Sequence, residues 1–321
     1  MRPLTDANLQ SNIPGLFLAG SLIDAQCIRV AQNQGHRIAK HIAGLVRSSG
    51  PRPAGFKDLI IVGSGPAGLS AGLSAKNLGL DVLVVDQYFL AATILAMPAG
   101  KVFDVNYMGN NEAAEGPLWF ENSPAPVLHA KWMDQVKESG LAVIVNDPVT
   151  GIRRDELNGQ FNIITAGGTY QSSFVLLCIG KAGAPRRLEV PGEAELYGKK
   201  RLHYSYRGPG TIHEKDILVV GGGNTAVEAV IGLAQDNHVT ISYRQPEFSR
   251  LTPKNYAALE MLSNKGSIHV MLNSHVVKFQ NNKVVFDIKG ETVERTFNEH
   301  FILIGFELPM ELLKNIGVMM A

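Results

Sequence analysis

Cysteine is scarce in this chain: only Cys27 and Cys178 occur among 321 residues, and they lie far apart in the sequence. Two distant cysteines exclude both a disulfide framework and a metal site built from several cysteines. A reducing, cytoplasmic environment is therefore expected. No metal is predicted, because the histidines that we considered lack the cysteine or carboxylate spacing of a metal site. These histidines are His36, His41, His203 and His213.

A surplus of charge is also absent, since 30 Lys and Arg stand against 29 Asp and Glu, for a formal net charge of +1. No block of like charge suggests a nucleic-acid partner. The apolar runs are only as long as strands, and the N-terminus lacks the continuous apolar stretch of a signal core. Neither membrane insertion nor export is expected.

Glycine, in contrast, is abundant at 33 residues, and three segments repeat one local order: an apolar strand-like run, glycine, then a helix-like stretch. These segments are 15–35, 59–78 and 217–234. Further strands are predicted at 81–86 and 238–244, so the last two segments form complete βαβ units. Other strands are predicted at 142–146, 161–165, 174–180, 267–272, 276–279, 283–288 and 301–305, and a helix at 124–138. The sequence therefore predicts an α/β protein with two Rossmann-like dinucleotide-binding domains.

The first dinucleotide motif follows the apolar run 59–62 as a G-x-G-x-x-G sequence, and an aspartate closes the next strand. The glycines allow a tight turn, the approach of a pyrophosphate to backbone N–H groups, and close packing of the helix on the sheet. The aspartate would accept hydrogen bonds from a ribose diol. The predicted contacts of this first cofactor are Gly63, Ser64, Gly65, Pro66, Ala67, Gly68, Asp86 and Gln87.

The second motif has the form G-x-G-x-x-A, and its strand-end residue carries the opposite charge. Asp86 lies 23 residues after Gly63, and Arg244 lies 23 residues after Gly221. A carboxylate suits a free 2′-hydroxyl, whereas a guanidinium suits a 2′-phosphate, so we expect FAD on the first unit and NADPH on the second. The predicted contacts are Gly221, Gly223, Asn224, Thr225, Ala226, Arg244 and, because it is near in sequence, Arg250. Surface exposure without a ligand is the alternative for both arginines.

Nearly the whole chain resembles the thioredoxin-reductase-like flavoproteins of the pyridine nucleotide-disulfide oxidoreductase superfamily. The shared signatures are GSGPAG at 63–68, GGGNTAVEA at 221–229, RRLEVPGE at 186–193 and SYRQPEFSR at 242–250. In that family a PGLFxAGD segment and a helix complete the FAD site at the C-terminus. Here the corresponding segment is at the front, at 13–21, and the chain stops where the family would continue into it.

The resemblance therefore implies a circularly permuted, discontinuous FAD domain. We expect a strand and helix of that domain at 1–48, a linker at 49–56, the FAD-binding domain at 57–187, the NADPH-binding domain at 188–305, and a return to the FAD domain at 306–321. The strand at 15–19, the helix from about 27 to 46 and the strand at 59–62 would form one right-handed crossover between neighbouring parallel strands. A stray remnant, or a segment exchanged between protomers, is the alternative for 1–48.

Two departures from the family bear on chemistry. Ser21 replaces the family's acidic flavin contact, so Gly20, Ser21, Asp24 and Gly180 are the predicted FAD contacts at this end. The Cys-x-x-Cys pair of a thioredoxin reductase is missing, which excludes a dithiol relay. Cys178 is expected to be an inert core thiol, and Cys27 to take no part in turnover.

The expected function is oxidation of NADPH through FAD, with electrons passed to an unidentified acceptor: a ferredoxin-like protein, a disulfide or a quinone. No catalytic side chain is assigned. The alternative is a flavin-binding regulatory or electron-transfer subunit with weak or no NADPH turnover. The family resemblance further implies a homodimer.

Overall fold

The computed structural model describes residues 2–25, 27–46, 55–95, 97, 102–106, 112–181, 184–206, 212–280, 282–307 and 309–321. The chain divides into two compact units. Unit 1 is formed by Met1–Leu95, Gly100–Gly183 and Leu308–Ala321, and unit 2 chiefly by Ala184–Glu307. Of the predicted linker 49–56, residues 49–54 lie outside the described residues.

Unit 1 contains short and long elements of both kinds. Its helices are the 3-10 helix η1 (Gly20–Ile23), α1 (Ile28–Val46), α2 (Pro66–Asn77), α3 (Ala92–Leu95), α4 (Ala125–Ser139) and α8 (Met310–Ile316). Its strands are β1 (Leu16–Leu18), β2 (Lys57–Val62), β3 (Val82–Val85), β4 (Val102–Phe103), β5 (Ser123–Pro124), β6 (Ala142–Ile144), β7 (Val149–Arg154), β8 (Phe161–Thr165) and β9 (Thr169–Leu177).

The main sheet of unit 1 has the order β6-β3-β2-β9-β8-β7, and β1 also pairs with β9. β1, β2, β3 and β6 run parallel to their partners, whereas β7 and β8 are antiparallel. The prediction that β1 and β2 are neighbouring strands is wrong, because β9 lies between them and pairs with both. The apolar end of β9, Val175–Leu177, is fully buried and offers each edge to a parallel strand.

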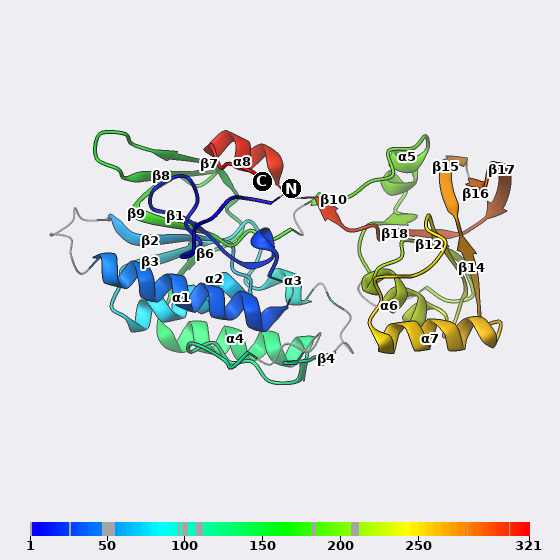
Figure 1. The fold of residues 1–321 in the computed structure, drawn as a ribbon, viewed down its shortest axis with the longest axis horizontal. Coiled ribbons are helices and arrows are strands. Elements are labelled where there is room, and N and C mark those ends of the chain that lie inside the picture. The colour runs from blue at the N-terminus through cyan, green and yellow to red at the C-terminus, as the bar shows by residue number, and fades with distance from the viewer. Residues whose placement is uncertain are drawn as a thin grey trace. The chain divides into compact units, whose positions relative to one another are not determined.

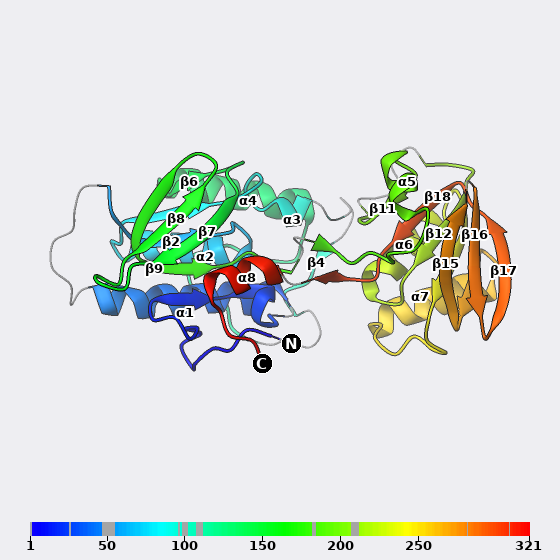
Figure 2. The ribbon, with the colours of Figure 1, turned by 90° about the horizontal axis from the view of Figure 1, so that it is seen from above.

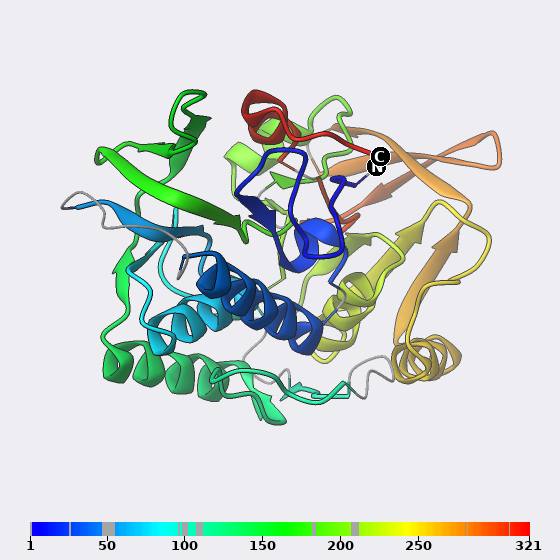
Figure 3. The ribbon, with the colours of Figure 1, turned by 60° about the vertical axis from the view of Figure 1, so that its left-hand side comes forward.

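Helices α1, α2 and α4 lie side by side on one face of this sheet (Figures 1 and 3). Pro66 is the first residue of α2, where a missing N–H costs nothing, and Gly140 ends α4 in the left-handed conformation. Residues alternate along the strands: Ile60 and Val62 join a core with β7, β8 and α8, whereas Ile61 faces α2. The sheet is thus covered on both faces.

The two ends of the chain meet beside unit 1 (Figures 1 and 2). Pro3 and Met320 form an antiparallel bridge. The Leu4 N–H donates to the Met319 carbonyl at 2.9 Å, and the Ala321 N–H donates to the Arg2 carbonyl at 2.7 Å. The N-terminal segment is therefore paired with the C-terminal one within the same unit.

Unit 2 repeats the same principle with a second, smaller sheet. Its helices are α5 (Glu193–Gly198), α6 (Asn224–Leu233) and α7 (Pro253–Asn264). Its strands are β10 (Ala184–Pro185), β11 (Leu202–His203), β12 (Asp216–Val220), β13 (His238–Tyr243), β14 (Ile268–Leu272), β15 (Ser274–Gln280), β16 (Lys283–Ile288), β17 (Glu291–Thr296), β18 (Glu299–Ile302) and β19 (Phe306–Glu307).

The parallel sheet of unit 2 has the order β11-β18-β12-β13-β14. Ile217 and Val219 of β12 pack with α6, whereas Leu218 and Val220 pack with the antiparallel sheet β15-β16-β17. That antiparallel sheet stands at the edge of the unit in Figure 2. The parallel sheets of both units confirm the predicted α/β class. No helix in the described ranges is both long enough and apolar enough to cross a membrane.

Candidate functional site

The first glycine turn, Gly63–Gly68, connects β2 to α2, as predicted. A Cβ on Gly63, whose φ is +101°, would lie 2.5 Å from the Cys178 carbonyl oxygen, and one on Gly68 would lie 1.9 Å from the Gly63 oxygen. Both positions therefore require glycine. A Cβ on Gly65 would meet nothing within 4 Å. The open backbone at Gly65, beside the first N–H groups of α2, fits a pyrophosphate.

Asp86 is fixed at the end of β3, next to this turn. One of its carboxylate oxygens accepts hydrogen bonds from the Ser64 N–H and the Ser64 hydroxyl, both at 2.6 Å. Its other oxygen accepts from the Tyr88 N–H at 2.9 Å. A carboxylate has about four acceptor sites, and three are occupied here, so the oxygen that accepts from Tyr88 can still accept one hydroxyl of a ribose diol. Gln87, the next predicted residue, is exposed.

The remaining predicted FAD residues lie at the ends of the next two strands. Gly180 (φ +64°) follows β9, and Gly20 (φ +78°) follows β1. The Ser21 hydroxyl accepts from the Lys181 N–H at 3.1 Å, and the Asp24 carboxylate pairs with the Lys181 ammonium. This hydrogen bond from Lys181 holds the pKa of Asp24 below its usual range. The carboxyl ends of β3, β2, β9 and β1 thus carry the predicted contacts in sheet order.

Helix α1 adds polar groups to the predicted contacts, and sequence reasoning did not single out Arg29 among them. A Cβ on Gly35 would lie 2.1 Å from the Ala67 oxygen, so α1 crosses α2 in close contact beside the first turn. Arg29 is 7% exposed and Gln32 is fully buried. Within the described part of the chain, the Arg29 Nε and Nη1 and the Gln32 Oε1 have no hydrogen-bond partner. The Arg29 Nη2 donates to the Phe120 carbonyl at 3.5 Å, but buried donors without a partner, such as Nε and Nη1, are costly, which favours a bound acceptor group there.

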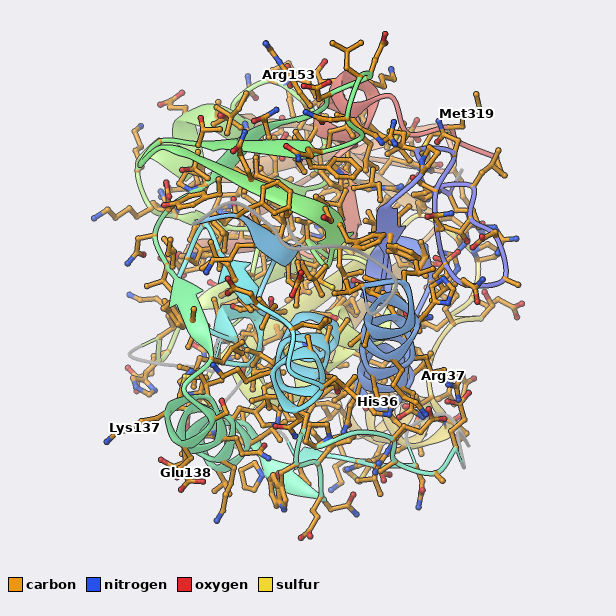
Figure 4. The ribbon with its side chains drawn as sticks, turned by 90° about the vertical axis from the view of Figure 1, so that its left-hand side faces the viewer. His36, Arg37, Lys137, Glu138, Arg153 and Met319 are labelled. Carbon is orange, nitrogen blue, oxygen red and sulfur yellow. The ribbon has the colours of Figure 1, made fainter. Side chains whose placement is uncertain are left out.

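Further along α1, two polar side chains make structural contacts. The His36 Nδ1 lies 2.8 Å from the Ser74 hydroxyl oxygen of α2, and Arg37 forms an ion pair with Glu115. Both side chains are labelled at the lower side of α1 in Figure 4. Burial and the neighbouring Lys40 lower the pKa of His36. These contacts explain His36 without a metal or a catalytic role.

The second glycine turn, Gly221–Ala226, connects β12 to α6. A Cβ on Gly221, whose φ is +145°, would lie 2.3 Å from the Leu303 carbonyl oxygen, and one on Gly223 would meet nothing within 4 Å. The first and middle glycines therefore have the same roles as in the first turn. A Cβ on Gly222 would lie 2.3 Å from the ring of Tyr243, so this ring packs directly against the glycine.

The two predicted arginines lie on the segment that follows β13. Arg244 and Arg250 are both exposed, and neither forms an ion pair with another described residue. The Asn224 side chain, at the start of α6, donates to the Arg250 carbonyl at 3.4 Å. The structure therefore brings Arg250 to the second turn, where sequence reasoning had only nearness in the chain. Thr225 is exposed beside them.

The cysteines differ in surroundings. Cys178 is buried at the end of β9 against Gly63, and burial raises the pKa of its thiol. Cys27 is half-buried immediately before α1. Two of the histidines contact single carboxylates: His203 lies 2.9 Å from Glu299, and His213 lies 3.6 Å from Asp236. No group of three metal-ligating side chains occurs among the residues that the structure describes.

Comparison with known proteins identifies the family. The family model described as pyridine nucleotide-disulphide oxidoreductase matches residues 60–321. The chain belongs to this family. Its members bind FAD and use NAD(P)H, and this chain is an NAD(P)H-dependent flavoprotein oxidoreductase of the thioredoxin-reductase-like type. Strand β1 and helix α1 precede the matched range.

The relatives are named for different activities. The bacilliredoxin reductase Bdr of Bacillus subtilis is 29% identical over 266 residues, which cover 81% of this chain and 80% of the relative. A ferredoxin–NADP reductase of Ignicoccus hospitalis is 28% identical over 277 residues, covering 83% and 82%. Among solved structures, the bacillithiol disulfide reductase Bdr of Staphylococcus aureus shares the fold, with a TM-score of 0.74, 24% identity, and coverage of 83% and 81%.

Proposed function

We propose that this protein oxidises NADPH through FAD and passes the electrons to an acceptor without a dithiol relay. The observation that carries this proposal is the pair of opposite charges at equivalent strand ends. Asp86 is hydrogen-bonded to the first turn, whereas Arg244 is exposed at the end of β13. A carboxylate repels a 2′-phosphate and a guanidinium binds one. The first unit therefore holds FAD, and the second selects NADPH over NADH.

The residues of unit 1 have separate tasks in this proposal. The open backbone at Gly65 and the start of α2 receive the pyrophosphate, and Asp86 holds the adenosine ribose. Gly180, Gly20 and the polar residues of α1 would hold the rest of the cofactor. There Arg29 and Gln32 offer a buried donor and a buried acceptor that have no other described partner. When bound, FAD supplies the hydride chemistry, and these side chains hold and orient it.

Anaerobic mixing tests the proposal. Purified protein with bound flavin is mixed with NADPH or with NADH, and the flavin absorbance is followed. Fast bleaching with NADPH and slow bleaching with NADH is the expected result. A spectrum that stays oxidised with both would favour a flavin-binding electron-transfer subunit instead, and faster bleaching with NADH would contradict the role of Arg244. Ferredoxin, a small disulfide and a quinone are then compared as acceptors of the reduced protein.

We also propose that residues 1–48 complete the FAD unit in circularly permuted order. The pairing of β1 with β9 supports this. The bridge between Pro3 and Met320 supports it too, because opening a continuous chain at one point leaves its two new ends next to each other. Moving residues 1–48 to the C-terminus after residue 321 should give a protein with unchanged flavin occupancy. Loss of flavin from a folded rearranged chain would contradict the proposal. Sedimentation of both chains tests the homodimer and a segment exchanged between protomers.

A further inference from the structure

Asn224, the first residue of α6, has a side chain that is almost completely engaged by another segment. Its Oδ1 accepts from the Thr252 N–H and from the Asn255 Nδ2, each at 2.9 Å. Its Nδ2 donates to the Arg250 carbonyl at 3.4 Å. Because three of its four hydrogen-bonding positions face residues 250–255, the side chain has little capacity left to bind a dinucleotide directly.

The segment 244–252 is held at a second point by aromatic packing. The Tyr243 and Phe248 rings stack, with centroids 5.2 Å apart and an interplanar angle of 10°. The Tyr243 ring in turn occupies the space that a side chain at Gly222 would need. Thr252 caps α7 by accepting from the Asn255 N–H at 3.3 Å, and Pro253 begins the helix. Both ends of the segment are therefore braced against the second glycine turn.

The two exposed arginines lie on this braced segment. A long side chain on an unbraced loop must order both itself and the loop when it binds an anion, and that ordering weakens binding. Fixing the backbone beforehand reduces the loss. The equivalent position in the first turn is Pro66, whose side chain cannot hold a loop by hydrogen bonds. The hydrogen bonds of Asn224 to residues 250–255 therefore occur in unit 2, the unit proposed to bind the cofactor with the additional phosphate.

We propose that Asn224 is a positioning residue for recognition of the 2′-phosphate. It holds the backbone of Arg250 at a fixed place beside the turn that receives the pyrophosphate, so that the Arg250 guanidinium reaches the 2′-phosphate at low entropic cost. This inference rests on the proposed function, because it requires an NADPH site on unit 2. It assigns Asn224 a role in cofactor selectivity and no direct contact with the reacting atoms.

The test compares two ligands that differ in the 2′-phosphate. The flavin-loaded full chain is titrated calorimetrically with 2′,5′-ADP and with 5′-AMP. Asn224→Ala should weaken 2′,5′-ADP binding about tenfold and 5′-AMP binding less than about twofold. Arg250→Ala should weaken 2′,5′-ADP at least as much. The double variant should match Arg250→Ala alone, because Asn224 acts through Arg250. Asn264→Ala, an exposed change at the end of α7, is the matched control and should change neither affinity.

Two further variants keep the test decisive if Asn224→Ala folds poorly. Asn255→Ala removes one donor to Asn224 without touching the turn, and it should lower the ratio of the two affinities about twofold to threefold. Asn224→Asp keeps the acceptor for Thr252 and Asn255 but removes the donor to the Arg250 carbonyl, so the ratio should fall about as far as in Asn224→Ala, and a ratio equal to that of the wild type would overturn the role of this contact.

The outcomes separate this inference from the proposed function. If the wild-type protein binds both ligands equally, the NADPH preference fails and the role of Asn224 fails with it. If the wild type discriminates but Asn224→Ala keeps the same ratio, or if the two single variants add in the double variant, only the role of Asn224 is overturned. Equal weakening of both ligands would reduce Asn224 to a structural residue of α6.

Discussion

The two glycine turns begin alike and then diverge. Gly63 and Gly221 each lie too close for a side chain against the carbonyl oxygen of the neighbouring parallel strand, at Cys178 and Leu303 respectively. The next residue differs: Ser64 binds the strand-end Asp86, whereas Gly222 leaves room for Tyr243. The first turn thus fixes the carboxylate at the end of the neighbouring strand. The second turn instead packs against the end of β13. A common backbone thus presents different side chains at the two turns.

The third glycine position extends this comparison. A Cβ on Gly68 would lie 1.9 Å from the Gly63 oxygen, whereas Ala226 already carries a Cβ and is fully buried. Helix α2 therefore approaches its strand more closely than α6 does. The closer approach places the first N–H groups of α2 against the turn, and this position tolerates no side chain at all.

Replacing Gly68 by alanine and Ala226 by glycine tests this comparison, and the first of these should give the largest effect. Gly68→Ala forces a Cβ onto a backbone oxygen and should destabilise unit 1 by at least about 3 kcal/mol, with loss of bound flavin. Ala226→Gly removes a methyl group from a helix and should cost only about 1 kcal/mol. Thermal unfolding and flavin absorbance after gel filtration measure both changes. Equal effects of the two substitutions would show that the helices approach their strands equally.

Removing the charge from the second strand end tests the other half of the comparison. Arg244→Ala should lower the ratio of kcat/KM for NADPH to that for NADH about tenfold to a hundredfold, since a charge-assisted bond to the 2′-phosphate is lost. Flavin content should not change. Steady-state rates with both nucleotides measure the ratio. Arg295→Ala, also an exposed arginine of unit 2, is the matched control, and a similar fall there would exclude a specific role for Arg244.

The sequence predicted these turns because their determinants are local. Glycine spacing, apolar strand runs and strand-end charges located both turns, and strands β8 and β16 have the predicted bounds. The neighbours of β1 were predicted wrongly, because strand order depends on contacts between distant segments. Local periodicity does not reveal that Val175–Leu177 of β9 can be paired on both edges.

The unpredicted burial of Arg29 and Gln32 has a similar explanation. Arg29 and Gln32 stand one helical turn apart in an amphipathic helix, and such residues are usually exposed. Their burial follows from the segment 112–120, since Arg29 contacts Phe120 and Gln32 donates to the Leu118 carbonyl. The hydrogen bonds of Asn224 to Arg250 and Thr252 likewise join residues more than 25 positions apart.

Lowering the pH should destabilise unit 2 more than unit 1, with an effect of intermediate size. His300 of unit 2 is fully buried, and burial lowers its pKa from 6.5 to about 4. The folded state therefore disfavours the proton: stability is complete above pH 6.5 and is lost as pH falls toward 4. Between pH 7 and pH 5 the loss should be on the order of 2 kcal/mol.

Hydrogen exchange can locate that loss. Peptides from β12 and β18 should lose protection at pH 5 relative to pH 7, after correction for intrinsic rates, while peptides from β2 and β9 change less. His300→Asn removes the titration and keeps a donor for the Arg201 carbonyl, which His300 contacts at 3.0 Å. The variant should show a smaller pH difference in unit 2. An unchanged difference would assign the acid sensitivity to another group.

The smallest effect is expected at the ion pair between Asp24 and Lys181. The side chains of Asp24 and Lys181 are 49% and 39% exposed, so the pair should stabilise the fold by less than about 1 kcal/mol. Because the pKa of Asp24 is lowered, this contribution is present at neutral pH and is lost as pH falls through the folded-state pKa. Asp24→Asn should therefore weaken FAD binding only about twofold to threefold.

Lys181→Met removes the same pair from the other side and should have the same effect, and the double variant should add nothing. Release of flavin on dilution, followed by fluorescence, measures all three proteins. A loss above about tenfold in Asp24→Asn alone would mean that the carboxylate contacts the cofactor itself. Unit 1 would then use a fixed carboxylate at both ends of its ligand, in contrast to the exposed arginines of unit 2.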